Sequence, residues 1–221
     1  MPGTRLAWRY FPSRVLSGDL FKVAPWSPAT LGCCILDASG RGVTAAARAA
    51  ALARLLAREE VPGEVTGHDP GQILTILNQR CPLTVAGESF TVWLGTLSLT
   101  TGELRFSTAG HAGAAILRRN ATVERVTRPS FPLGFVPGAR YSTLTTVVGS
   151  GDRLLMFSDG IYDAISPTGE RWGLDRVERA LARHASLDLS EYLKAIIGDA
   201  RAWQHRPRFQ DDAALVGLEI G

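Results

Sequence analysis

The spacing of apolar residues changes along the sequence. These changes divide the chain into predicted helices and predicted strands. Residues 30–36 form a continuous apolar run typical of a buried strand, and residues 44–60 show the spacing of an amphipathic helix. Asp69-Pro70 predicts the start of a second helix that runs to about residue 78, with proline at its first position. From Phe90 onward the alternation is that of strands.

The later strands are separated by turn residues at short intervals. Residues 90–99 and 103–110 flank a turn signal, and so do residues 114–120 and 123–126, which predicts two hairpins. Further strands are expected at residues 6–10, 15–23, 141–148, 153–157 and 213–220. Loops are expected where prolines and glycines gather, at residues 25–28, 61–67 and 129–138. Helices are expected around residues 174–181 and from Asp188, where Glu191 completes a capping box.

Hairpin-linked strands with helices in pairs indicate an antiparallel α+β domain and not a doubly wound one. The chain has 221 residues, of which 45% are hydrophobic, so it can bury one substantial core. We therefore expect one domain over residues 1–221.

The charge balance gives little support for nucleic-acid binding. Lys+Arg number 24 against 21 Asp+Glu, a net charge of +3, and the arginines are scattered and not gathered into a run. A mild basic excess favours an acidic or phosphorylated partner.

The cysteines and apolar runs indicate a soluble cytoplasmic protein. Cys33, Cys34 and Cys81 are odd in number and lack zinc-ligand spacing, which favours a reducing compartment. We find no signal peptide and no apolar run of membrane length.

Four aspartates stand where predicted strands end or become irregular: Asp19, Asp37, Asp159 and Asp211. Each one alone is ordinary turn chemistry. Together, several carboxylates are the oxygen ligands that a pair of Mg²⁺ or Mn²⁺ ions requires. Two such ions can activate a shared water for attack on phosphorus.

An ordered set of motifs now gives a resemblance to a known family. The motifs are SGD, LDASGRG, TGELRFSTAGH, FPLGF, GDRLLMFSDG and QDDAALV, and they extend from about Tyr10 to the last residue. The chain resembles the metal-dependent serine/threonine protein phosphatases of the type 2C (PPM) superfamily, in their bacterial SpoIIE-like or RsbU-like branch. The resemblance implies two packed antiparallel sheets flanked by helix pairs, an αββα sandwich, with a dinuclear Mn²⁺ or Mg²⁺ site at one end.

The resemblance also implies a role for each acid. Asp37 matches the bridging ligand, and the backbone carbonyl of Ala38 matches a ligand of one ion. Asp19 matches the acid on that ion's side. Asp159 and Asp211 match the terminal ligands of the other ion.

Residues around these acids match further parts of the family's site. Gly40, Gly42 and Gly160 would let the backbone turn close to the metals. Arg41 is a candidate phosphate contact.

Other positions depart from the family pattern or support its ligands. Asp163 and Asp212 are expected to orient the ligands from behind. Ser17 stands where a glycine is common, and Ser39 stands where eukaryotic relatives carry a histidine, which leaves the leaving-group acid open. Lys22 replaces a second acid and is expected to lower the negative charge near the first metal.

The activity implied is hydrolysis of phosphoserine or phosphothreonine by direct attack of metal-activated water. The implied substrate is a phosphorylated STAS-domain anti-anti-sigma factor in a partner-switching stress or sporulation pathway, with an activator protein or homodimer contact as a possible means of control. Two alternatives stay open. The first is a degenerate phosphatase fold that binds a signalling partner without catalysis. The second is ATP binding at the SGRG loop, which lacks a following Gly-Lys-Ser/Thr.

Overall fold

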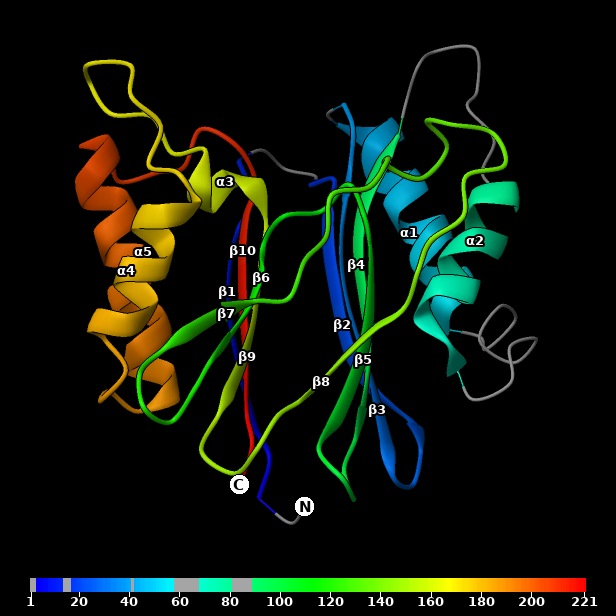
Figure 1. The fold of residues 1–221 in the computed structure, drawn as a ribbon. Helices are drawn as coiled ribbons and strands as arrows, with labels where there is room; N and C mark the ends of the chain where they lie inside the picture. Colours follow the sequence, from blue (N-terminus) through cyan, green and yellow to red (C-terminus); the bar gives the residue numbers. More distant parts are fainter. Residues whose placement is uncertain (1–2, 14–16, 41, 58–67, 81–88) are drawn as a thin grey trace. The chain divides into compact units, whose positions relative to one another are not determined.

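Two antiparallel sheets carry the fold, and each belongs to its own compact unit (Figure 1). The computed structural model describes residues 3–13, 17–40, 42–57, 68–80 and 89–221. Unit 1 comprises Met1–Val15, Gly113–Val126 and Val148–Gly221, and unit 2 comprises Leu16–Ala112 and Thr127–Val147. The predicted α+β class with two antiparallel sheets and flanking helices is confirmed.

Unit 2 contains the sheet with strand order β2-β3-β4-β5-β8. Its strands are β2 Asp19–Ser27, β3 Thr30–Ala38, β4 Phe90–Ser98, β5 Glu103–Ala109 and β8 Leu144–Val147. Its helices are α1 Val43–Ala57 and α2 Pro70–Arg80, and they cover one face of the sheet (Figure 1).

Alternation along β3 assigns the two faces of this sheet. Cys34 and Leu36 join the apolar cluster beneath α1 and α2, together with Leu52 of α1 and Leu74 of α2. Residues at odd positions, among them Ile35, therefore point to the opposite face.

Unit 1 contains the sheet with strand order β1-β10-β9-β6-β7. Its strands are β1 Arg5–Phe11, β6 Ala114–Leu117, β7 Val123–Arg125, β9 Arg153–Phe157 and β10 Ala213–Glu219. Its helices are α3 Asp159–Tyr162, α4 Leu174–Arg183 and α5 Leu189–Gln204. The helices cover one face of the sheet, where Leu155, Tyr192 and Leu193 are fully buried (Figure 1).

The helix starts agree with the predicted caps. The Asp188 carboxylate accepts hydrogen bonds from the backbone amides of Ser190 and Glu191 at the start of α5, whereas the Glu191 carboxylate pairs with Lys194 and does not complete the predicted capping box. Asp69 accepts one from the Gln72 amide, with Pro70 as the first residue of α2. None of the helices in the described segments is long and apolar enough to cross a membrane.

One prediction about local structure is wrong. Residues 25–28 were expected as a loop, but β2 continues through Ser27, with a register shift between Pro25 and Ser27. An edge strand tolerates proline because one side of its backbone has no partner strand. The strand predicted at residues 153–157 is found as β9, and Asp159 directly after it begins the short helix α3. The loop predicted at 61–67 lies outside the described residues.

Candidate functional site

The two acids of unit 2 lie directly opposite each other in neighbouring strands. Asp19 is the first residue of β2 and pairs in register with Asp37, the last residue but one of β3. Cross-strand partners project to the same face, so the two carboxylates are neighbours on the face away from α1 and α2. Asp19 is 6% exposed and Asp37 is half-buried. We call Asp19 and Asp37 the strand pair.

The backbone around the strand pair is closely packed. The Ala38 amide donates to the Gly18 carbonyl at 3.2 Å, and the Asp19 amide donates to the Ser17 hydroxyl at 3.0 Å. A Cβ at Gly18 would lie 2.9 Å from the carbonyl oxygen of Ala38, the predicted backbone ligand. Glycine at position 18 therefore keeps that oxygen accessible, and Ser17 fixes the amide of Asp19.

The loop after Asp37 is anchored through Ser39. Its amide donates to the Ser89 carbonyl at 2.9 Å, and its hydroxyl accepts from the Ser89 amide at 2.7 Å. Gly40 and Gly42 have φ of +94° and +83°, so glycine is needed there for backbone conformation. A Cβ at either position would meet nothing within 4 Å, so close approach is not the reason. Arg41 lies outside the described residues.

The two acids of unit 1 lie on segments that contact each other through Ser158. Asp159 begins α3 directly after Ser158, whose buried hydroxyl accepts from the Ala214 amide at 2.8 Å and donates to the Asp212 carbonyl at 3.3 Å. A Cβ at Gly160 would lie 2.0 Å from that same carbonyl. The start of α3 is therefore held against the chain at Asp211, and we call Asp159 and Asp211 the loop pair.

Neighbouring polar residues brace the loop pair. The Asp212 carboxylate accepts from the amide and hydroxyl of Ser13 at 2.7 and 2.8 Å, which ties the end of β1 to this segment. Asp163 contacts the Arg171 guanidinium through both carboxylate oxygens at 3.1 Å. The predicted orienting roles of Asp163 and Asp212 stay predictions. Ser13 and Ser158 were not predicted, because a serine beside an acidic turn is common in loops.

The strand pair has the chemistry of a divalent-cation site. Like charges directly opposite each other in a sheet destabilise it, and burial of a carboxylate adds to that cost. A cation between them removes both costs, and the oxygen donors present suit Mg²⁺ or Mn²⁺. Among the described residues, no group of three or more His, Cys, Asp or Glu is placed to hold a metal ion. The four acids are thus two pairs in two units, and their joining in one site stays a prediction.

Lys22 does not share the face of the strand pair. It lies three residues after Asp19 in a regular stretch of β2, so its side chain points to the opposite face. There it lines a small hollow with Cys34 and Leu56 under α1. The expectation that Lys22 lowers the charge beside the first metal is therefore not supported by its position.

His111 is buried near the strand pair. It is 3% exposed, and its Nδ1 lies 3.1 Å from the hydroxyl of Thr91, which pairs in register with Asp37. The imidazole is therefore packed inside unit 2. Its place at the acid-bearing end of the sheet was not predicted.

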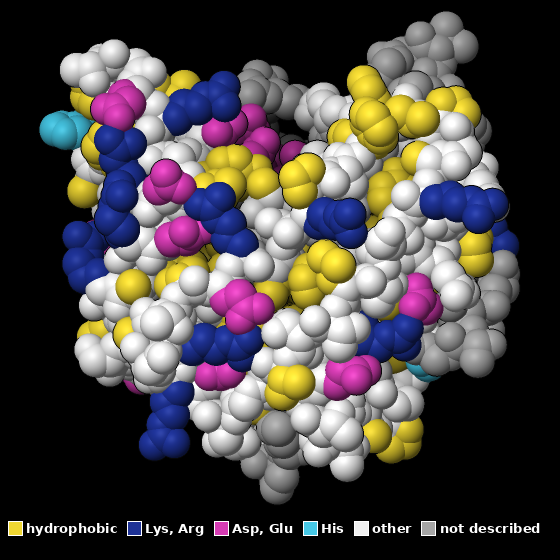
Figure 2. Space-filling model, in the orientation of Figure 1, with side chains coloured by type: hydrophobic (Ala, Val, Ile, Leu, Met, Phe, Trp, Pro, Cys, Tyr) yellow, Lys and Arg dark blue, Asp and Glu magenta, His cyan; other side chains and the backbone are white. Residues whose placement is uncertain are grey.

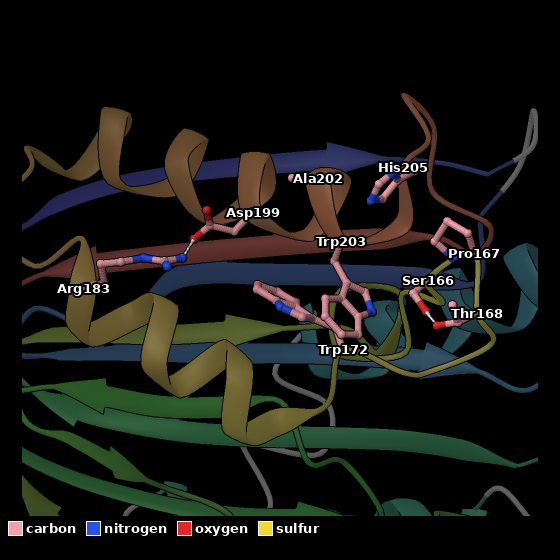
Figure 3. A pocket seen from close by; sticks show the side chains of 9 residues that line it. All are labelled: Ser166, Pro167, Thr168, Trp172, Arg183, Asp199, Ala202, Trp203 and His205. Carbon is pink, nitrogen blue, oxygen red and sulfur yellow. Dashed lines mark hydrogen bonds and ion pairs between the residues drawn. The ribbon is translucent and has the colours of Figure 1, made fainter.

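An open hollow of about 610 Å³ lies on the helical side of unit 1 (Figure 3). It is lined by Trp172 and Trp203, by the segment that follows α3, and by an ion pair between Arg183 and Asp199. None of the predicted acids lines it. We do not take this hollow as the candidate active site, because the described residues that line it offer no free carboxylate: Asp199 is paired with Arg183.

Solved structures with the same fold include PP2C phosphatase domains. The SiaA-PP2C domain of Pseudomonas aeruginosa matches with a TM-score of 0.85 at 20% identity, covering 98% of this chain and 86% of that one. The PP2C domain of SpoIIE from Bacillus subtilis gives 0.81 at 19% identity, covering 98% and 63%. The RsbU and RsbW domains of Rv1364c from Mycobacterium tuberculosis give 0.79 at 23% identity, covering 99% and 60%. The fold is that of the PP2C phosphatase domains.

Sequence comparison assigns the family. The family model described as Stage II sporulation protein E (SpoIIE) matches residues 27–221, and the chain belongs to this family. Protein IcfG of Synechocystis is 24% identical over 199 residues, which cover 79% of this chain and 31% of IcfG. The chain thus spans about a third of the curated relative it matches.

Proposed function

We propose that the chain is a metal-dependent protein phosphatase that hydrolyses phosphoserine or phosphothreonine. The observation that carries the proposal is the strand pair: in a member of the SpoIIE family, Asp19 and Asp37 are opposed in register at the end of a buried sheet. Such an arrangement is stable at neutral pH when a divalent cation shares the two carboxylates.

In this proposal the strand pair and the loop pair together hold two Mn²⁺ or Mg²⁺ ions. By the family resemblance, Asp37 would be a ligand of both ions, Asp19 and the Ala38 carbonyl would be ligands of one, and Asp159 and Asp211 would be ligands of the other. When bound, such ions supply Lewis-acid activation of water and neutralise charge on a phosphoryl group. The contribution of the chain is rigidity: Gly18, Ser158 and Gly160 fix the backbone beside the acids.

The proposed substrate is a phosphorylated STAS-domain anti-anti-sigma factor in a partner-switching pathway of the cytoplasm. The M. tuberculosis protein of similar fold carries RsbU and RsbW domains in one chain, which supports a signalling setting of this kind. An activator protein or a homodimer contact would control the activity.

The proposal is tested by Mn²⁺-dependent phosphate release from p-nitrophenyl phosphate and from a STAS-domain protein phosphorylated on serine. Asp37→Asn should lower the rate on both substrates by about 10³-fold or more, because a bridging ligand is lost. Titration calorimetry with Mn²⁺ should show weaker binding in the same variant. Asp175→Asn is the matched control, since this carboxylate is 82% exposed on α4 and should leave both measurements unchanged.

The adaptor alternative predicts a different outcome. A wild-type protein that binds the STAS-domain protein but releases no phosphate with Mn²⁺ or Mg²⁺ would support an adaptor and contradict the proposal. Lys22, which stands where the family has a second acid, motivates that alternative, and its side chain lies under α1 on the face away from the strand pair. ATP turnover without phosphatase activity would support the nucleotide alternative.

A further inference from the structure

Two phenylalanines stand exposed on the segment between β7 and β8. Phe131 and Phe135 are 54% and 53% exposed, and their rings stack with centroids 6.2 Å apart. Hydrophobic side chains gather over this segment at the upper right of Figure 2, with basic side chains beside them. Burying one such ring in a partner is worth roughly 2–3 kcal/mol.

The segment that carries the two rings is firmly anchored. Leu133, between them in sequence, is fully buried and exchanges two backbone hydrogen bonds with Phe90, at 2.8 and 3.1 Å. The buried Asn78 of α2 accepts from the Gly134 amide at 2.8 Å and donates to the Val136 carbonyl at 3.0 Å. The anchoring therefore presents the rings to solvent in fixed positions, and a partner that binds them loses little conformational entropy.

Two arginines border the same surface. Phe131 lines a hollow of about 280 Å³ together with Arg128 and Arg140, and both arginines are exposed. Neither guanidinium takes part in an ion pair within the part of the chain that the structure describes. Arginine and aromatic residues are enriched at the centres of protein interfaces. We call Arg128, Phe131, Phe135 and Arg140 the Phe–Arg surface.

This surface lies in the same unit as the strand pair and close to it. Ala38 pairs in register with Phe90, and Phe90 bridges to Leu133. Two strand spacings therefore separate Ala38 from Leu133, a distance of about 10 Å. One folded protein partner can reach both places.

We propose that the Phe–Arg surface is the docking site for the protein substrate, and that it binds a segment in which an apolar side chain lies beside carboxylates. The apolar group covers the stacked rings, and the carboxylates pair with Arg128 and Arg140. This proposal rests on the proposed function, and it assigns substrate recognition to residues outside the acid-bearing site.

Two double variants test the docking site, Phe131→Ser with Phe135→Ser and Arg128→Glu with Arg140→Glu. Rates are measured on p-nitrophenyl phosphate and on the serine-phosphorylated STAS-domain protein. Each double variant should lose about tenfold or more in kcat/KM on the protein. Turnover of p-nitrophenyl phosphate should stay within about twofold, since it makes no docking contact. Leu187→Ser and Arg179→Glu, exposed positions of unit 1, are the matched controls and should behave as wild type.

Equal losses on both substrates, or no loss on either, would overturn the docking site. If the wild type hydrolyses neither substrate, the proposed function fails, and calorimetric binding of the phosphorylated STAS-domain protein decides the docking site separately. Binding that the double variants abolish would support it, and absence of binding to the wild type would overturn it.

Discussion

The two halves of the predicted site are built by different means. The strand pair is set by the register of β2 against β3, so backbone hydrogen bonds of a sheet determine which carboxylates face each other. The loop pair depends on single side chains, since the Ser158 hydroxyl and the missing Cβ of Gly160 hold α3 against Asp212. A ladder distributes its stabilisation over many bonds. The loop pair depends instead on one hydroxyl group and one glycine. We therefore expect a single substitution to disrupt the loop pair more easily than the strand pair.

The largest effect is expected from Gly160→Ala. Its Cβ would lie 2.0 Å from the Asp212 carbonyl oxygen, a backbone atom that moves only if β10 or α3 moves. We expect a loss of about 3 kcal/mol in the free energy of unfolding and a phosphatase rate too low to measure. Urea denaturation and p-nitrophenyl phosphate hydrolysis give the two quantities.

Gly198→Ala is the control for that variant. Gly198 lies exposed within α5 and a Cβ there meets nothing within 4 Å, so alanine should stabilise the helix by about 0.5–1 kcal/mol. A Gly160→Ala protein as stable and active as wild type would show that the loop pair is as robust as the strand pair.

The sequence predicted most of the regular structure because its signals are local. Two examples are the strands predicted at residues 90–99 and 103–110 and the helix start predicted at Asp188. Their signals depend only on neighbouring residues, and the structure contains β4, β5 and the start of α5 at these places. The extension of β2 through Pro25 was missed because its cause is distant: β2 is an edge strand, and Trp26 packs over Gly32 of β3.

The acidic residues of the candidate site could be predicted from the sequence. The strand register and the hydrogen bonds that position them could not. Asp19 and Asp37 stand out as acids at strand ends, yet only the register shows that they face each other. Ser158 gives no signal in the sequence, because its partner Ala214 is 56 residues away. The many prolines and glycines of residues 129–138 indicate a structured loop, but they do not reveal that Leu133 is buried while Phe131 is exposed.

An intermediate effect is expected from Asp69→Asn, which tests an acid network of unit 2. Burial raises the pKa of the Asp69 carboxyl, but hydrogen bonds from Thr143 and the Gln72 amide and the charge of Arg105 outweigh it, so the pKa lies below its usual value. The stabilisation is therefore present above the unfolded pKa of about 3.9 and is lost as pH falls through the lower folded value. Asparagine at position 69 can still cap the helix, but it cannot form the ion pair with Arg105. We therefore expect the free energy of unfolding to fall by about 1 kcal/mol at pH 7 and by less toward pH 3.

Denaturation of both proteins at pH 7 and pH 3 measures that difference. Asp188→Asn is the matched control at the cap of α5, where the carboxylate interacts with the Arg5 guanidinium through charge but, among the described residues, forms no ion pair with it. If the difference in the free energy of unfolding between wild type and Asp69→Asn is as large at pH 3 as at pH 7, the stabilising ion pair of Asp69 with Arg105 is contradicted.

The smallest effect is expected from Lys22→Met. This variant tests whether the charge of Lys22 influences a cation bound at the strand pair. The side chains of Asp19 and Lys22 project from opposite faces of β2, and the Cα atoms of these residues are about 10 Å apart. Lys22 is partly exposed, so water and salt weaken the interaction between its ammonium group and a bound cation, with a Debye length of about 8 Å at physiological ionic strength. Methionine can occupy the same hollow beside Cys34 and Leu56. We expect Mn²⁺ affinity, measured by calorimetry, to change by no more than about twofold. A tenfold gain would mean that Lys22 acts on the metal despite the intervening sheet, and that the charge at this position sets the affinity of the strand pair.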